Sequence, residues 1–129
     1  TGYSAAVLAR LAHSVVAVES DSSLAAEARA NIASIGAANV AVVEGALETA
    51  GKSKGPYDVI ILEGAVETVP EALFGQLKPE GVLVASVAEA GRLAVAHLYA
   101  RSGKGIAARR TFDARLPPLA PSSEDRFVF

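Results

Sequence analysis

The 129 residues predict one domain spanning 1–129, and a hydrophobic content of 51% is enough for a single core. The 14 acidic and 12 basic residues are mixed along the chain, so the net charge of −2 leaves no basic face for nucleic acid or an anionic membrane. The sequence contains no cysteine, which excludes a disulfide framework and a cysteine-ligated metal and leads us to expect a cytoplasmic protein. His13 and His97 are isolated in sequence, so no metal site is predicted.

The chain starts on an alanine-rich helix. Residues Ala5 to Ala12 have high helix propensity, and the predicted apolar stripe consists of Val7, Leu8 and Leu11. In an alternating α/β pattern a strand comes before the helix. We therefore expect the first strand of the sheet to be missing from this chain.

The next segments alternate strand, helix and strand. Val15 to Glu19 is an apolar strand that ends on an acid, and residues 19–23 supply several caps for the helix that follows. Gly36 is the predicted C-cap of this helix, and Asn39 to Val43 is the second strand. The helix is expected to bury one face, made by Leu24, Ala28, Ile32 and Ile35.

The run Val59 to Leu62 contains only β-branched and aliphatic residues. It predicts a parallel strand that is covered by helices on both faces. In open α/β sheets ligands bind beyond the carboxyl ends of the strands. The chemistry is therefore expected at the residues that follow, Glu63, Gly64 and Ala65.

A helix is expected over Glu71 to Lys78. Thr68 and Glu71 have the spacing of a capping box, and Pro70 falls in the first turn, where its missing N–H costs nothing. The sequence Pro79-Glu80-Gly81 is expected to end the helix.

The last third of the chain departs from this alternation. Val82 to Val87 reads as another buried strand, but Leu93 to Arg101 and Ile106 to Arg115 are two strand-like runs around a predicted hairpin turn at Ser102 to Gly105. We expect Pro117 to Phe129 to be a coil held by its aromatic residues. The pattern predicts an α/β fold with a mostly parallel sheet and a C-terminal antiparallel hairpin.

Several blocks of sequence, taken in order, resemble the class I S-adenosylmethionine-dependent methyltransferases, and among them the protein-L-isoaspartate O-methyltransferase family. The resemblance implies a Rossmann-like three-layer sandwich, and it covers Thr1 to about Val87. Thr1-Gly2-Tyr3 is similar to the end of the family's Gly-x-Gly-x-Gly-Tyr loop. The remaining blocks are Asn39 to Gly45, Pro56 to Ile60 and Val69 to Gly81.

The resemblance implies a binding site for S-adenosylmethionine. Gly2 would let backbone N–H groups approach the carboxypropyl end of the cofactor, and Glu19 would accept hydrogen bonds from the two ribose hydroxyls. The adenine would be flanked by residues of the loop after the second strand, and the methyl group would lie near the end of the third. The cofactor-binding residues implied are Gly2, Tyr3, Glu19, Ser20, Gly45, Ala46, Leu47, Glu63 and Gly64.

The sequence departs from the family at two of these places. The family commonly has Asp at the position of Ala46, to meet the adenine amino group, and Thr-Ala at the position of Glu63 and Gly64. Its active-site Ser and first motif glycines lie upstream of the position of Thr1. No catalytic residue is therefore assigned, and Ser4 is not the equivalent of that Ser.

The resemblance implies a methyltransferase that acts on the carboxylate of a protein or peptide, as in the repair of isoaspartyl residues, with this chain alone expected to be inactive. The absence of acid/base residues is no objection, because such a transfer depends mainly on positioning. A non-catalytic nucleotide-binding or interaction module is the alternative, and Ala46 favours it. A nicotinamide-dependent Rossmann enzyme is disfavoured, because its sheet would continue with parallel units where this sequence predicts a hairpin.

Overall fold

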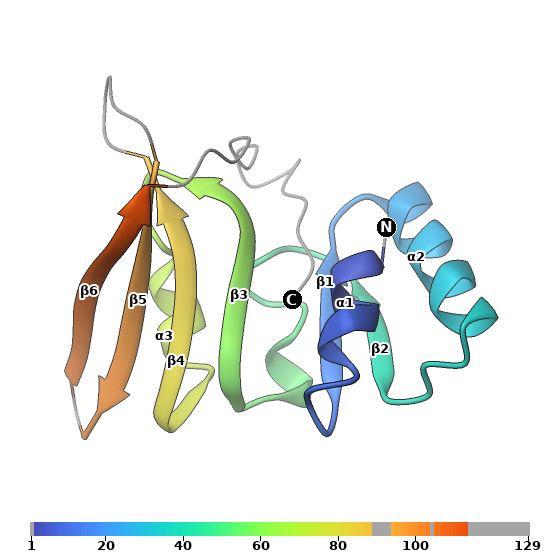
Figure 1. The fold of residues 1–129 in the computed structure, drawn as a ribbon, viewed down its shortest axis with the longest axis horizontal. Coiled ribbons are helices and arrows are strands. Elements are labelled where there is room, and N and C mark those ends of the chain that lie inside the picture. Colours follow the sequence, from blue (N-terminus) through green and yellow to red (C-terminus); the bar gives the residue numbers. More distant parts are fainter. Residues whose placement is uncertain (1, 89–93, 104, 114–129) are drawn as a thin grey trace. The chain divides into compact units, whose positions relative to one another are not determined.

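The computed structural model describes residues 2–88, 94–103 and 105–113. The described residues divide into two compact units, the first running to Lys54 and the second starting at Gly55. The coil expected over Pro117 to Phe129 lies outside the described residues. In chain order (Figure 1) the elements are α1 (Tyr3–Leu8), β1 (Val15–Glu19), α2 (Ser22–Ser34), β2 (Val40–Glu44), the 3₁₀ turn η1 (Lys52–Lys54), β3 (Tyr57–Val66), α3 (Glu71–Phe74), β4 (Leu77–Val87), β5 (Val95–Ser102) and β6 (Gly105–Asp113).

The first unit contains a parallel pair of strands. β1 and β2 keep an unbroken register from Val15 opposite Val40 to Glu19 opposite Glu44, which confirms both predicted strands. Among the described residues β1 pairs with β2 alone. Because the strands are parallel and end together, their carboxyl ends form one edge of the sheet.

Helix α2 begins and ends as the sequence indicates. The Asp21 side chain accepts hydrogen bonds from the N–H groups of Ser23 at 2.9 Å and Leu24 at 3.0 Å, so it is the N-cap. The C-cap is Ile35, one residue before the predicted Gly36, and Gly36 follows it with φ +69°. The buried face is made by Ala25, Ala28 and Ile32.

Three residues that were predicted to lie in the core, Ile35, Val7 and Leu11, are exposed. Ile35 is 61% exposed, because the helix has already ended when the chain reaches it. In α1, Val7 and Leu11 are also exposed, whereas Ala5 is fully buried and Leu8 is partly buried. Small alanine side chains form the inner face of α1 because they allow its backbone to approach the sheet closely. The core of this unit is formed by Ala5, Val15, Ala17 and Ile32.

The second unit contains a four-stranded sheet in the order β3-β4-β5-β6. β3 pairs parallel with β4, and β5 pairs antiparallel with both β4 and β6, which confirms the predicted hairpin. The turn between β5 and β6 includes Gly103 at φ +57°. Within the described ranges β3 pairs with β4 alone.

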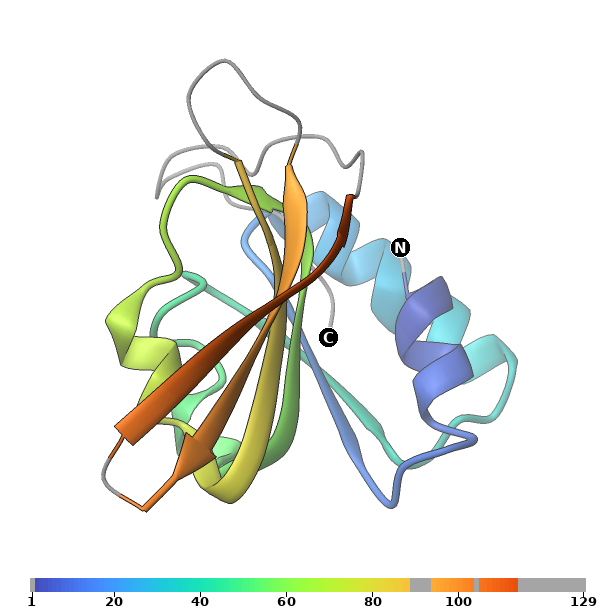
Figure 2. The same cartoon turned by 60° about the vertical axis from the view of Figure 1, so that its left-hand side comes forward.

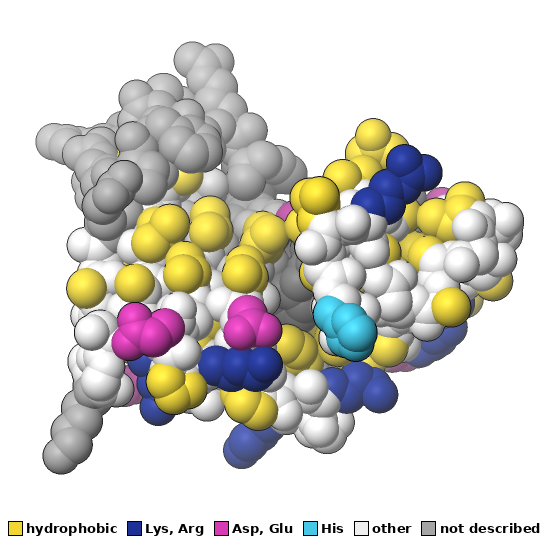
Figure 3. Space-filling view, turned by 60° about the horizontal axis from the view of Figure 1, so that its bottom comes forward, with side chains coloured by type: hydrophobic (Ala, Val, Ile, Leu, Met, Phe, Trp, Pro, Cys, Tyr) yellow, Lys and Arg dark blue, Asp and Glu magenta, His cyan; other side chains and the backbone are white. Residues whose placement is uncertain are grey.

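Helix α3 covers one face of this sheet (Figure 2). The Phe74 ring lies 5.1 Å from the ring of Tyr99, and Tyr99 is the register partner of the buried Leu83, whose other partner is Ile60. These side chains therefore share the α3 face. Val59 alternates onto the other face and is 54% exposed, so the prediction that helices cover both faces of β3 is wrong for this residue. Hydrophobic side chains gather on the face opposite α3 (Figure 3).

The predicted helix over Glu71 to Lys78 is too long. α3 ends at Phe74, and no side chain caps its start, so Thr68 and Glu71 form no capping box. The reason is tertiary: the Tyr57 N–H donates to the Gln76 carbonyl at 2.7 Å, which draws the following residues into β4. The segment Pro79-Glu80-Gly81 consequently lies inside β4.

No helix in the described part of the chain is long and apolar enough to cross a lipid bilayer.

Candidate functional site at the carboxyl edge of the first unit

Three structural features converge at one end of the first unit. β1 and β2 end there, at Glu19 and Glu44. Helix α1 starts at the same end, because it runs antiparallel to β1 and is joined to it by a short loop (Figure 1). Such an edge, with strand carboxyl ends and a helix start, is where α/β sheets bind ligands. Seven of the nine residues that the resemblance implies for cofactor binding lie here: Gly2, Tyr3, Glu19, Ser20, Gly45, Ala46 and Leu47.

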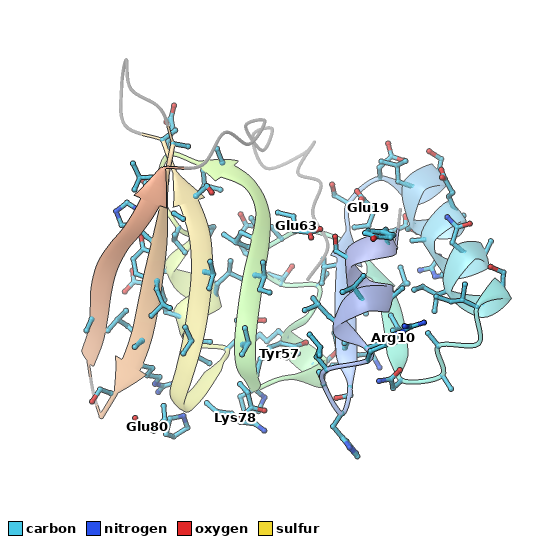
Figure 4. The ribbon with its side chains drawn as sticks, in the orientation of Figure 1. Arg10, Glu19, Tyr57, Glu63, Lys78 and Glu80 are labelled. Carbon is cyan, nitrogen blue, oxygen red and sulfur yellow. The ribbon has the colours of Figure 1, made fainter. Side chains whose placement is uncertain are left out.

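Glu19 is the buried acid of this edge, and Figure 4 shows it at the end of β1. Only 6% of Glu19 is exposed, which is unusual for a carboxylate. Its Oε1 accepts a hydrogen bond from the backbone N–H of Asp21 at 3.0 Å. One such bond leaves most of the four acceptor positions of a carboxylate available. The side chain can therefore accept further hydrogen bonds from a ligand with neighbouring hydroxyl groups.

Gly2 gives α1 its close contact with α2. Its φ of +94° favours glycine, and a Cβ atom built there would stand 3.3 Å from the Ala28 carbonyl oxygen and 3.4 Å from Ile32 Cγ1. The Gly2 carbonyl accepts the N–H of Ala6 at 3.0 Å, which begins the helix. The N–H groups of the first turn have no acceptor within the helix. Tyr3, which opens the helix, is 79% exposed.

Gly45 joins the two strand ends. Its N–H donates to the Glu19 carbonyl at 3.1 Å, and its φ is +151°. A Cβ atom there would stand 2.8 Å from the Cβ of Ala50, so a larger residue would displace the loop. Ala46 is exposed, and its carbonyl accepts the N–H groups of Thr49 at 3.2 Å and Ala50 at 2.9 Å.

Two further residues predicted for this edge differ in what they can offer a ligand. Leu47 is only 3% exposed and therefore belongs to the core more than to the surface. The Ser20 hydroxyl oxygen is buried and has no hydrogen-bond partner among the described residues. A buried hydroxyl without a partner is uncommon in proteins, and water or a ligand often satisfies it.

The other two predicted residues, Glu63 and Gly64, belong to the second unit. The sequence indicated that these residues follow the strand. They lie within it, because β3 continues to Val66. The register of β3 shifts there: Ile61 is opposite Val84 and Ala65 is opposite Ser86, so Leu62, Glu63 and Gly64 stand against Ala85 alone. The residues form a β-bulge, a feature that often occurs next to binding sites.

Sequence reasoning missed two contributors to the edge in the first unit. Ala50 packs where the side chain of residue 45 would otherwise be, and Ala28 provides the backbone against which Gly2 rests. Neither alanine carries a local sequence signal. The glycines opposite them, in contrast, could be picked out from sequence.

Two tyrosine side chains, Tyr57 and Tyr99, are among the other ionisable groups of the described residues. Burial raises the pKa of the Tyr57 and Tyr99 hydroxyls, so both stay protonated at neutral pH. The described residues contain no cluster of His, Asp and Glu able to hold a metal ion. The chemistry that this arrangement supports is binding and orientation of a ligand.

Comparison with known proteins gives a consistent result. The model of the family described as protein-L-isoaspartate(D-aspartate) O-methyltransferase matches residues 1–120. The protein-L-isoaspartate O-methyltransferase of Azorhizobium caulinodans is 34% identical over 119 residues, which are 92% of this chain and 55% of that protein. The chain thus spans about half the length of the curated relatives it matches.

Two solved structures are similar in fold. A protein-L-isoaspartate O-methyltransferase superposes with a TM-score of 0.86 at 28% identity, over 96% of this chain and 40% of that one. A Plasmodium falciparum protein described as the same type of methyltransferase, in complex with S-adenosyl-L-homocysteine, gives 0.70 at 21% identity, over 83% and 52%. These matches confirm the predicted Rossmann-like α/β methyltransferase fold.

Proposed function

The chain belongs to the protein-L-isoaspartate(D-aspartate) O-methyltransferase family, and on this premise we propose that the protein binds S-adenosylmethionine and methylates a carboxylate. The acceptor we propose is an isoaspartyl residue of a protein or peptide, so that the reaction serves protein repair. One observation carries the proposal: the buried Glu19 carboxylate lies at the carboxyl edge of β1 with acceptor positions available. A ribose with two free hydroxyls is a ligand that satisfies such a carboxylate.

The residues at this edge fit the cofactor. Glu19 would accept the ribose hydroxyls, and the buried Ser20 hydroxyl would gain a partner. The N–H groups at the start of α1, beside Gly2 and Tyr3, would approach the carboxypropyl end. Gly45, Ala46 and Leu47 would border the adenine, and the family resemblance also assigns Glu63 and Gly64 to the methyl group.

When bound, S-adenosylmethionine supplies a methyl group on a sulfonium, ready for displacement by a carboxylate oxygen. The residues of this chain would hold and orient the reactants, which is the main contribution a protein makes to such a transfer. Ala46 offers the adenine amino group no carboxylate, and its carbonyl already accepts two backbone N–H groups. The proposal therefore includes a cofactor affinity lower than an Asp at this position would give.

We further propose that the chain from Thr1 to Phe129 transfers no methyl group by itself and that the protein works in the cytoplasm. Two facts support the first point: among the described residues β1 pairs with β2 alone, and β3 with β4 alone. Each free strand edge carries N–H and C=O groups that need partners. The second point is supported by the absence of cysteine.

The experiment titrates the purified full-length gene product with S-adenosylmethionine by calorimetry and then assays it with radiolabelled cofactor. The substrate is a peptide with one isoaspartyl residue, and the control is the same peptide with a normal aspartyl residue. We expect binding, and a base-labile methyl ester on the isoaspartyl peptide only. Binding without transfer to either peptide would favour the non-catalytic module, and the absence of binding would refute the cofactor assignment. The chain Thr1 to Phe129 is assayed alongside, and methyl transfer by it would contradict its predicted inactivity.

A further inference from the structure

The Glu19 carboxylate is held by the backbone two residues further along the chain. In the described part of the chain the recorded hydrogen bond to this carboxylate comes from the N–H of Asp21, at 3.0 Å from Oε1. A glutamate side chain has three rotatable bonds, so its two oxygens face a pair of ribose hydroxyls only when the carboxyl plane is held in one orientation. The direction of the Asp21 N–H therefore decides how Glu19 presents itself to a ligand.

The Asp21 side chain determines where that N–H points. Its Oδ1 accepts hydrogen bonds from the N–H groups of Ser23 at 2.9 Å and Leu24 at 3.0 Å, and from the Ser23 hydroxyl at 2.6 Å. The Asp21 carbonyl accepts the N–H of Ala25 at 2.9 Å. These contacts hold the residue in the extended conformation of an N-cap, with φ −85° and ψ 120°. Asp21 is thus bonded to α2 on one side and to Glu19 on the other.

The packing of α2 gives this connection a rigid base. Ala25 and Ala28, on the inner face of the helix, are 0% and 2% exposed. Figure 1 shows that α2 follows directly on the end of β1, so the link between strand and helix is short. All of these contacts lie within the first unit.

We propose that Asp21 is a positioning residue for the cofactor: its side chain fixes the backbone N–H that orients the Glu19 carboxylate toward the ribose. The inference rests on the proposed function and adds a residue whose role needs no contact with the ligand. Three donors of the chain already occupy Oδ1 of Asp21. A carboxylate that is held in place before binding loses less conformational freedom when the ligand arrives, which raises the affinity.

The test titrates S-adenosylmethionine into variants of the full-length protein and measures dissociation constants by calorimetry. Asp21→Ala removes the acceptor of the cap, and we expect about five-fold weaker binding, which corresponds to about 1 kcal/mol. Asp21→Asn keeps an oxygen acceptor and is an equally good N-cap, so it should bind like the unmodified protein. Recovery by asparagine would assign the effect to the cap and not to the negative charge.

A matched control separates positioning from stability. Ala26→Gly, at an exposed position inside α2, weakens the helix about as much as the loss of a cap and leaves the contacts of Asp21 in place. It should lower the midpoint of urea unfolding as Asp21→Ala does, but leave the dissociation constant unchanged. Asp21→Gly covers the case that Asp21→Ala does not fold, because glycine is tolerated at an N-cap and has no side-chain acceptor. It should also bind the cofactor about five-fold more weakly.

A double-variant cycle gives a readout that a purely structural role would not move. If Asp21 acts through Glu19, then Asp21→Ala should weaken binding little further in a protein that already carries Glu19→Ala. Additive losses in this cycle would overturn the role of Asp21. The same holds for an equal loss of affinity in Ala26→Gly, for binding by Asp21→Asn as weak as that of Asp21→Ala, and for unchanged affinity in Asp21→Gly.

These outcomes would leave the cofactor assignment intact, because the unmodified protein would still bind S-adenosylmethionine. The absence of binding to the unmodified protein would instead refute the proposed function, and the role of Asp21 with it.

Discussion

The two units of the molecule build their cores from different residues. In the first, the fully or nearly fully buried positions are mostly alanines and valines, such as Ala5, Ala17 and Val18. In the second unit the positions with the least exposure are mostly leucines, such as Leu73 and Leu83. Alanine faces bring helix and strand backbones close together, whereas leucines fill a wider space between layers. The first unit should therefore be sensitive to added volume and the second to lost volume.

The units also differ in how regularly their parallel strands pair. β1 and β2 keep one register and end together, which places Glu19 beside Glu44. β3 and β4 shift register between Tyr57 and Val59 and again between Ile61 and Ala65. A regular pair presents groups at a shared strand end, and an irregular pair presents them from a bulge within the strand. The two arrangements offer a ligand different kinds of contact.

The largest effect is expected from removing volume in the second unit. Leu83 is fully buried, so Leu83→Ala should lower the free energy of unfolding by about 2 to 5 kcal/mol, from lost transfer energy and the cavity left behind. Urea unfolding followed by circular dichroism measures it. Val59→Ala, at a position 54% exposed in the neighbouring strand, should cost below about 1 kcal/mol. Equal costs for the two variants would show that the leucine core does not stabilise this unit.

Adding volume should be the more damaging change in the first unit. Ala5 is fully buried on α1, and Ala5→Leu should cost about 1 to 3 kcal/mol because the helix would be forced away from β1. Ala26→Leu is the control: Ala26 is exposed on α2, and leucine and alanine have similar helix propensities. The same urea titration compares them. A tolerated Ala5→Leu would remove the contrast between the two cores.

The shared end of β1 and β2 leads to a prediction about cofactor binding. Glu19→Ala should weaken S-adenosylmethionine binding by about 1 to 3 kcal/mol, because the ribose hydroxyls would lose their acceptor. Glu44→Ala, its exposed register partner, should leave the affinity unchanged. Calorimetric titration of the full-length protein measures both. Equal affinities of Glu19→Ala and the unmodified protein would exclude Glu19 from the site.

The smallest effect is expected at Glu80, a residue of β4 with a positive φ. Glu80 is exposed and has φ +66°, a conformation that costs an L-residue about 1 to 2 kcal/mol. Glu80→Gly should raise the free energy of unfolding by about 0.5 to 1 kcal/mol, since the greater freedom of glycine in the unfolded chain offsets part of the gain. Glu67→Gly, at an exposed position without positive φ, should be neutral or destabilising. A thermal melt that ranks Glu80→Gly below the unmodified protein would contradict this account.

The sequence alone determined the elements that depend on local chemistry. Continuous apolar runs predicted β1, β2 and the core of β3, because strands between layers exclude polar residues. The N-cap of α2 and Gly36 near its end could be predicted from the sequence. Both depend only on the backbone groups and conformation at the ends of the helix. Glu19, the acid that ends β1, and the glycines Gly2 and Gly45 could also be picked out from the sequence. Each has a role that depends on its own charge or on its own backbone conformation.

Tertiary structure decided the features that depend on a distant partner. The length of α3 was wrong in the sequence analysis because pairing of Tyr57 with Leu77 takes the end of the predicted helix into β4. The face of α1 was wrong because close approach to β1 favours Ala5 over the larger Val7. The bulge at Glu63 exists only as a mismatch between the residues of β3 and those of β4. Such features arise from contacts between segments far apart in sequence, which no local pattern records.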